Sequence, residues 1–148
     1  MARKRSREVV VDASLVLHLA LPAYPYHEQA FRRFSQWADE GVTLIAPHLF
    51  AAEVDSGIRR LVHSGALTPE AGQQAQKIVD ALAVRLVYNT RVRRRAREIA
   101  EHLHQSRVYD ATYAALAELR RSEFWTADRR FYRAARNALS FVHFIGHD

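Results

Sequence analysis

The chain of 148 residues has the size of one compact domain, which we expect to span 8–148 behind a basic N-terminal tail, 1–7. It has no cysteine, which excludes a disulfide framework and thiolate metal sites, and no apolar run near the roughly 20 residues that cross a bilayer. The apolar stretch after the basic start is too short for a secretory signal, so we expect a cytoplasmic protein with no membrane partner.

The formal net charge is +6. Of the 22 lysine and arginine residues, all except Lys4 and Lys77 are arginine. Arginine makes bidentate contacts with phosphate, so the excess is compatible with a nucleic acid or another acidic partner. A GC-rich genome explains an arginine-rich chain equally well, and charge alone therefore leaves the function open.

Strands and helices alternate in the first half of the chain. EVVVD (8–12) is a short apolar run that ends in an acid and is typical of a buried strand. A helix over about 14–20 follows, and apolar residues at three- and four-residue spacing predict another over 25–37. TLIAP (43–47) predicts a second buried strand, and 48–63 a third helix.

The second half continues this pattern. Thr68 and Pro69 suit the cap and the first position of a helix. The other expected elements are a strand at 84–89, helices at 91–105 and 109–121, a strand at 123–127, a short helix at 128–137 and a strand at 140–145. Strands that alternate with helices and are apolar on both faces indicate an α/β fold, a single domain with an open parallel sheet of about five strands and helices on both faces.

Four acidic residues lie where the strands of such a sheet end. Asp12 ends the first strand, and Asp128 follows the fourth. Asp110 begins the helix that leads into the fourth strand, and Glu53 lies about two turns into the helix after the second. Ligands of open α/β sheets bind beyond the carboxyl ends of the strands. Four carboxylates would repel one another there unless a cation neutralised them, which predicts a site for Mg²⁺, or for Mn²⁺.

Each acid also has a purely structural explanation. The three aspartates stand at predicted helix starts, where aspartate is a favoured N-cap. Glu53 could be a surface residue, but Leu49, Ala52 and Ser56 share its face, and we expect Leu49 and Ala52 to be buried. Asp55 is excluded, because two residues farther along the helix it points to nearly the opposite face.

The motifs around these acids resemble those of a known family. They are VVVDAS (9–14), the Glu53 of PHLFAAEV, YDATYAALAE (109–118) and TADRRF (126–131). Together they look like the successive motifs of PIN-domain nucleases, and the chain is most similar to the VapC-type toxins of bacterial and archaeal toxin–antitoxin pairs. The resemblance runs from about Glu8 to Ile145.

The resemblance implies that all four acids hold the metal and that Ser14 and Thr126 assist the site. It implies an Mg²⁺-dependent endoribonuclease that cleaves single-stranded RNA and leaves a 5′-phosphate, a cognate antitoxin as partner, and a homodimer. In one respect the chain departs from the family, which often has an asparagine one turn after the glutamate where this chain has Ser56. That departure weakens the case for a supporting contact from this position.

Arginine clusters are candidates for RNA contacts. Arg129 and Arg130 directly follow Asp128 and are the stronger ones, whereas the run 91–97 is equally explained as a solvated helix face. A basic module that binds RNA or a protein partner without cutting remains the alternative to an enzyme. The chain lacks the HExxH pattern of a histidine zinc site, and it lacks a phosphate-binding glycine loop.

Overall fold

The computed structural model of the protein describes residues 6–146. Of the expected basic tail, residues 1–5 lie outside the described part. Ser6 and Arg7 contact the start of the sheet, where the Ser6 and Thr43 hydroxyls are 2.8 Å apart and Arg7 forms ion pairs with Glu40 and Glu123. None of the helices in the described part is both long and apolar enough to cross a membrane.

Five parallel strands form one sheet in the order β3-β2-β1-β4-β5. Val10 of β1 is paired with Ile45 of β2 on one side and with Phe124 of β4 on the other, which places β1 at the centre. The strands are β1 (Glu8–Val11), β2 (Thr43–Pro47), β3 (Arg85–Val87), β4 (Glu123–Thr126) and β5 (Val142–Phe144). The predicted α/β class and parallel sheet are therefore confirmed.

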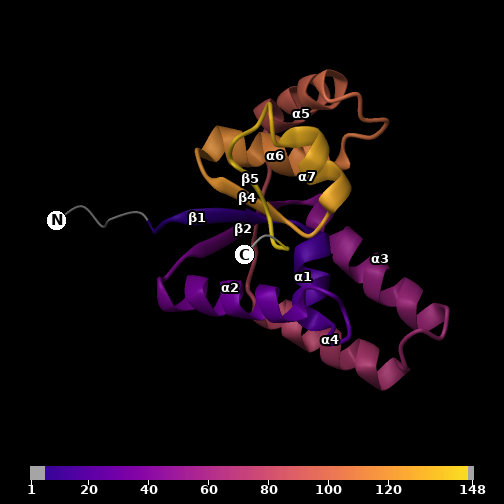
Figure 1. The fold of residues 1–148 in the computed structure, drawn as a ribbon. Coiled ribbons are helices and arrows are strands. Elements are labelled where there is room, and N and C mark those ends of the chain that lie inside the picture. The colour runs from indigo at the N-terminus through magenta and orange to yellow at the C-terminus, as the bar shows by residue number, and fades with distance from the viewer. Residues whose placement is uncertain (1–5, 147–148) are drawn as a thin grey trace.

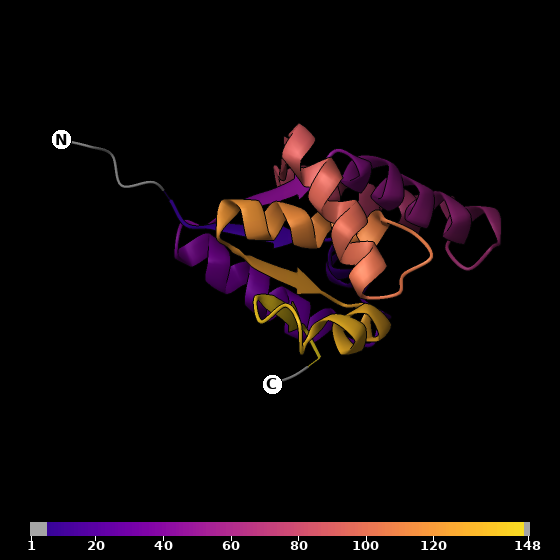
Figure 2. The same cartoon turned by 90° about the horizontal axis from the view of Figure 1, so that it is seen from above.

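Helices cover both faces of the sheet, as expected. Helices α5 and α6 lie above it in Figure 1, and α2 and α4 lie below it; Figure 2 shows α5 and α6 from their own side. The helices are α1 (Ala13–Ala20), α2 (His27–Asp39), α3 (Leu49–His63), α4 (Pro69–Ala81), α5 (Thr90–His102), α6 (Tyr109–Arg120) and α7 (Arg129–Ala135). Each lies within a few residues of its predicted place.

The core forms because the central strand is apolar on both faces. Val9, Val10 and Val11 are fully buried, which removes their side chains from water on either side of the sheet. Helix α6 packs directly across β1, β2 and β4, and the small buried side chains Ala111 and Ala114 permit this close approach. The first turn of α6 is thereby held at the carboxyl end of β1.

Candidate active site

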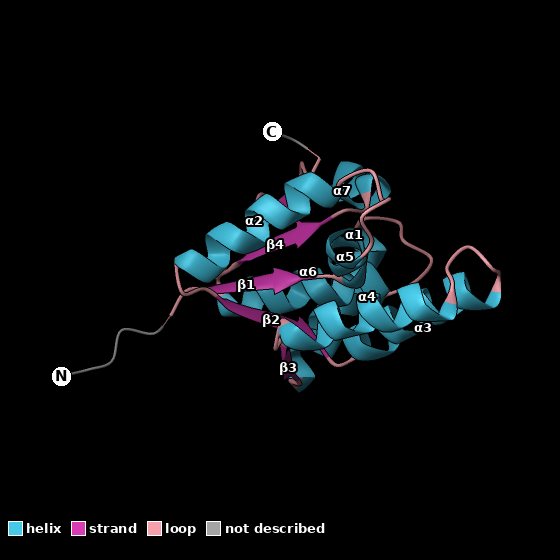
Figure 3. Ribbon diagram, turned by 90° about the horizontal axis from the view of Figure 1, so that it is seen from below, coloured by secondary structure: helices cyan, strands magenta, loops and turns pink. Residues whose placement is uncertain are grey.

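The four predicted acids all lie at the carboxyl edge of the sheet. In Figure 3 the arrowheads of β1, β2 and β4 point toward the same end of the molecule, where α1, α3 and α7 begin. Asp12 lies between β1 and α1, and Asp128 lies between β4 and α7. Asp110 is in the first turn of α6, and Glu53 is in the second turn of α3.

Asp12 is the most buried of the four carboxylates, with 3% of its surface exposed. Its Oδ1 accepts hydrogen bonds from the Leu15 amide at 2.9 Å and the Ser14 hydroxyl at 2.7 Å, and its Oδ2 accepts one from the Thr126 hydroxyl at 2.5 Å. Burial raises the pKa of Asp12 from 3.8 to about 7, although the three hydrogen bonds oppose the rise. The carboxylate is thus fixed in orientation and poorly solvated.

Ser14 and Thr126 join the end of β1 to the end of β4. The Ser14 hydroxyl accepts a hydrogen bond from the Ala127 amide at 3.1 Å, and the Thr126 hydroxyl accepts one from the Asp128 amide at 2.9 Å. Thr126 is fully buried. Both hydroxyls, expected only to assist the site, therefore also hold Asp12 and Asp128 at a fixed separation.

Asp110 interacts electrostatically with each of the other three acids. Burial, together with the negative charges of Asp128 and Glu53, raises its pKa from 3.8 to about 6. The charge of Asp110 in turn contributes to the raised pKa of Asp12. Because such effects act over short separations, Asp110 lies near each of the other three acids.

Tyr113 is a site residue that the sequence did not suggest. Its hydroxyl donates a hydrogen bond of 2.6 Å to Oε1 of Glu53, and its ring is 1% exposed. Burial raises the pKa of the Tyr113 hydroxyl well above its usual range, so the group remains a donor. The available signal was spacing, since a residue three positions after Asp110 lies on the same face of α6.

The expected burial around Glu53 was partly wrong. Ala52 is exposed and Leu49 is only half-buried, because the buried face of α3 is the one that packs against α1 and α4. That face consists of Phe50, Val54, Gly57 and Ile58. Glu53 itself is half-buried at the border of the face, and this desolvation raises its pKa although the Tyr113 hydrogen bond opposes the rise.

The capping explanation holds for two of the aspartates and fails for the third. Asp12 and Asp128 each accept the backbone amide of the third residue beyond them, as N-caps do. Asp110 is not a cap, and it accepts no hydrogen bond from any residue between 6 and 146. A half-buried carboxylate without a donor is costly to retain in a fold, so helix capping cannot account for the whole cluster.

No positive side chain between residues 6 and 146 forms an ion pair with any of the four acids. Nor do three or more acidic or histidine side chains in this part stand in a ready-made geometry for a metal ion. Mg²⁺ usually keeps several water ligands and needs only one or two carboxylates. The oxygens of Asp110, together with Glu53 Oε2 and Asp128 Oδ2, accept no protein hydrogen bond in the described part, so they suit a hydrated divalent cation.

The two arginines after Asp128 differ in their surroundings. The Arg129 Nη2 donates a hydrogen bond of 2.8 Å to the Tyr26 hydroxyl, and its guanidinium lies 5.5 Å from the ring centre of Phe144. Arg130 is exposed and forms no hydrogen bond or ion pair within residues 6–146. Arg129 is therefore oriented by its neighbours, whereas Arg130 extends into solvent.

Comparison with known proteins agrees with this fold. The fold is similar to that of PAE2754 from Pyrobaculum aerophilum, with a TM-score of 0.61 and 19% identity over 87% of this chain and 86% of that one. It is equally similar to VapC20 from Mycobacterium tuberculosis, a sarcin-ricin loop cleaving toxin, with a TM-score of 0.61 and 19% identity over 85% and 94% of the two chains. No curated protein matches the sequence. The PIN domain family model matches residues 9–137, which includes all four acids, and the chain therefore belongs to the PIN domain family.

Proposed function

We propose that the chain is an endoribonuclease that depends on Mg²⁺ or Mn²⁺ and cleaves RNA at the Asp12, Glu53, Asp110 and Asp128 site. The observation that supports this most directly is the electrostatic coupling of Asp110 to the three other acids, none of which forms an ion pair with a cation within residues 6–146. Such a cluster is costly to form without a bound cation. Membership of the PIN domain family supports the same function.

The chain's own residues hold and orient the reacting groups. The Ser14 and Thr126 hydroxyls fix Asp12, and the Tyr113 hydroxyl fixes Glu53, so two of the carboxylates are oriented before any substrate arrives. Asp110 offers its oxygens at the centre. The four carboxylates would hold a divalent ion, which would lower the pKa of a water molecule and stabilise negative charge on the phosphate. No general-base histidine is required.

Cleavage of a labelled RNA tests this proposal. Purified protein should cut single-stranded RNA in Mg²⁺ or Mn²⁺, leave 5′-phosphate ends, and lose activity in EDTA. Asp12→Asn and Asp110→Asn should each lower the rate at least about 100-fold, as loss of a group acting on the transition state does. The matched control is Asp55→Asn, which removes an exposed carboxylate two residues from Glu53. Undiminished cleavage by Asp110→Asn protein would refute the assignment.

A toxin of a toxin–antitoxin pair is the cellular role that we propose for this nuclease. VapC20, whose fold is similar, is a sarcin-ricin loop cleaving toxin, so a hairpin with that loop should be tested beside unstructured RNA. Expression should arrest growth, Asp12→Asn should relieve the arrest, and a small DNA-binding antitoxin should be encoded in the adjacent reading frame. Harmless expression of active enzyme would refute the toxin role and leave the nuclease in place.

A homodimer and a cognate antitoxin are the proposed protein partners, and localisation in the cytoplasm remains a prediction. The alternative function is a basic module that binds RNA or a partner without cutting. The two functions differ in the metal-dependent cleavage that the four acids would support, because a binding module would retain RNA affinity in EDTA and show no cleavage with either metal.

A further inference from the structure

An open groove of about 350 Å³ lies next to the acidic site. The two share elements: Leu49 of the groove is one turn before Glu53 on α3, and Val108 and Thr112 of the groove flank Asp110 at the start of α6. Residues four apart on a helix are neighbours on its surface. A chain molecule bound at the acids would therefore extend into this groove.

The floor and rim of the groove are apolar and aromatic. Tyr88, which follows β3, is 67% exposed, and Val108 is 43% exposed. The Tyr88 ring lies 5.9 Å from the His48 ring at an angle of 60°, so one edge of Tyr88 is supported and most of its ring is open to solvent. An exposed aromatic ring beside a basic strip is the arrangement on which single-stranded nucleic acids stack their bases.

Two arginines of α5, Arg93 and Arg97, complete the groove. They are exposed, they lie one turn apart, and neither forms an ion pair or hydrogen bond within residues 6–146. None of the described residues that line the groove is acidic. The groove is therefore a positively charged channel with unoccupied guanidinium groups, which is complementary to a phosphate backbone.

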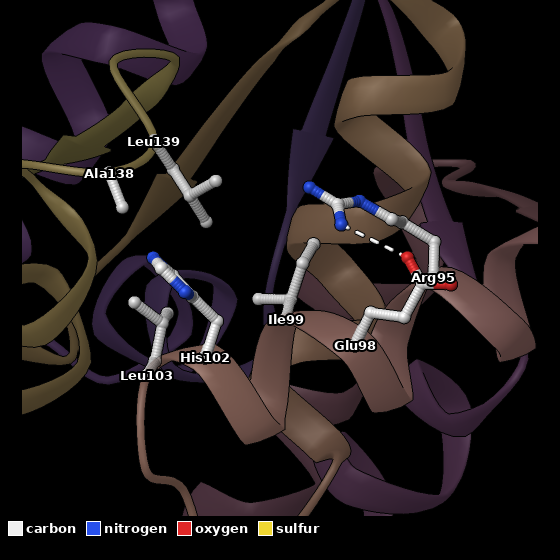
Figure 4. Close-up of a pocket in the computed structure, with 7 residues that line it drawn as sticks. All are labelled: Arg95, Glu98, Ile99, His102, Leu103, Ala138 and Leu139. Carbon is white, nitrogen blue, oxygen red and sulfur yellow. Dashed lines mark hydrogen bonds and ion pairs between the residues drawn. The ribbon is translucent and has the colours of Figure 1, made fainter.

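On the opposite side of α5, by contrast, the arginine is paired with acids. A second cavity, of about 340 Å³, is lined there by Arg95, Ile99 and Leu139, among others (Figure 4). Arg95 is held by Glu118 at 2.6 Å and by Glu98 at 3.1 Å, so its charge is already neutralised. Only the groove side of α5 combines unpaired arginines with an exposed aromatic ring next to the acids.

We infer that this groove binds one nucleotide of the RNA beside the phosphate that is cleaved, with its base on Tyr88 and its backbone phosphate at Arg93 and Arg97. The inference rests on the proposed ribonuclease function. It assigns to the chain a substrate subsite that depends on stacking and charge. Because every base has a π-face, the subsite favours single-stranded RNA over a paired strand.

Binding of a fluorescein-labelled single-stranded RNA in EDTA tests the subsite without cleavage. Tyr88→Ala should weaken binding about 5- to 160-fold, the range for loss of one stacked base, whereas Tyr88→Phe should keep the affinity. The Arg93→Gln, Arg97→Gln double variant should reduce the slope of log affinity against log salt by about 0.7, the value for one phosphate contact on a single strand. The matched control is Arg94→Gln, which removes the same charge from an 80% exposed side chain that pairs with Glu98.

The subsite and the ribonuclease function can be tested separately with a substrate that is too small to reach the groove. Tyr88→Ala should raise KM for RNA and leave hydrolysis of bis(p-nitrophenyl) phosphate in Mn²⁺ unchanged, whereas Asp110→Asn should abolish both. Wild-type protein that cleaves neither substrate would refute the ribonuclease function. Active enzyme whose RNA affinity is unchanged in both Tyr88→Ala and the Arg93, Arg97 double variant would refute the subsite. The subsite would also be refuted if these variants lost dimerisation or binding of a protein partner but kept their affinity for RNA.

Discussion

The Tyr113 hydroxyl donates a hydrogen bond of 2.6 Å to Oε1 of Glu53 and so links α6 to α3 across the carboxyl edge of the sheet. Tyr113 also lies one turn from Asp110 on α6. One buried phenol therefore ties Glu53 to the helix that carries Asp110. Loss of this hydrogen bond would free Glu53 to move relative to Asp110.

Tyr113→Phe should lower kcat for RNA cleavage about tenfold, the lower range for loss of a hydrogen bond to a charged group. The Tyr113 ring is stacked on Phe124, with ring centres 5.7 Å apart and planes 8° apart, and phenylalanine preserves this packing. We therefore expect folding to be retained, as measured by thermal unfolding. Tyr109→Phe on the same helix is the control, because Tyr109 is 51% exposed and its hydroxyl forms no hydrogen bond with any of the acids. Full activity of Tyr113→Phe protein together with loss of activity in Glu53→Gln would contradict this role.

Thr126→Val should impair both stability and cleavage. The Thr126 hydroxyl donates to Asp12 and accepts the Asp128 amide, so an isosteric valine leaves two buried polar groups without their partner. Such losses cost about 1–3 kcal/mol each, and cleavage should fall at least tenfold as Asp12 loses its orientation. Thr126→Ser keeps the hydroxyl and should retain most of the activity. Equal loss in the serine and valine variants would indicate that the methyl group, rather than the hydroxyl, is needed.

The stability of the metal-free protein should decrease as pH rises from about 5 to 8. Burial raises the pKa of Asp12 from 3.8 to about 7 and that of Asp110 to about 6. The folded state binds protons at these aspartates more tightly than the unfolded state does, so protonation stabilises the fold. This stabilisation is complete below the pKa of an aspartate in the unfolded chain, and it is lost as the pH rises through the pKa values of the folded state. Thermal unfolding in EDTA should give a Tm several degrees lower at pH 8 than at pH 5.5, since about 1 kcal/mol corresponds to roughly 2–4 °C.

Two further measurements of Tm test whether the acids cause that pH dependence. Mg²⁺ should restore the Tm at pH 8, because a ligand that binds only the folded state stabilises it. Asp12→Asn should raise the metal-free Tm at pH 8 and flatten its pH profile, since the asparagine still offers an oxygen to the Leu15 amide. A profile for Asp12→Asn with the same slope as wild type would mean that other groups cause the effect.

The sequence predicted the elements and the place of the acids because both depend on local patterns. The run Val9, Val10, Val11 requires burial on two faces, and an aspartate directly after it must lie at the sheet edge. The role of Tyr113 was not predictable in this way, since its partner is 60 residues away and the tertiary fold brings the two together. The buried face of α3 was misjudged for the same reason, because α1 and α4 determine which side of that helix is covered.

The run 91–97 illustrates a second limit of sequence reading. Its arginines are alike in the sequence, yet Arg95 is neutralised by Glu118, which is 23 residues away, while Arg93 remains unpaired. Helical periodicity separates the two faces, but only the position of α6 determines which face meets an acid. Distant partners thus decide which arginines are free for RNA.

Arg130→Gln should weaken RNA binding in EDTA and reduce the salt slope by about 0.7, because an exposed guanidinium that follows Asp128 is placed to contact a phosphate beside the site. Arg129→Gln should have a larger effect, since the hydrogen bond to Tyr26 already orients the Arg129 side chain, which therefore loses less conformational freedom on binding. Arg136→Gln, an equal loss of charge at the far end of α7, serves as the control. The measurement is anisotropy of a labelled RNA across a range of salt concentrations. Equal, small effects in all three variants would show that the charge acts only at long range, whereas selective effects of Arg129 and Arg130 would place the RNA backbone along the start of α7.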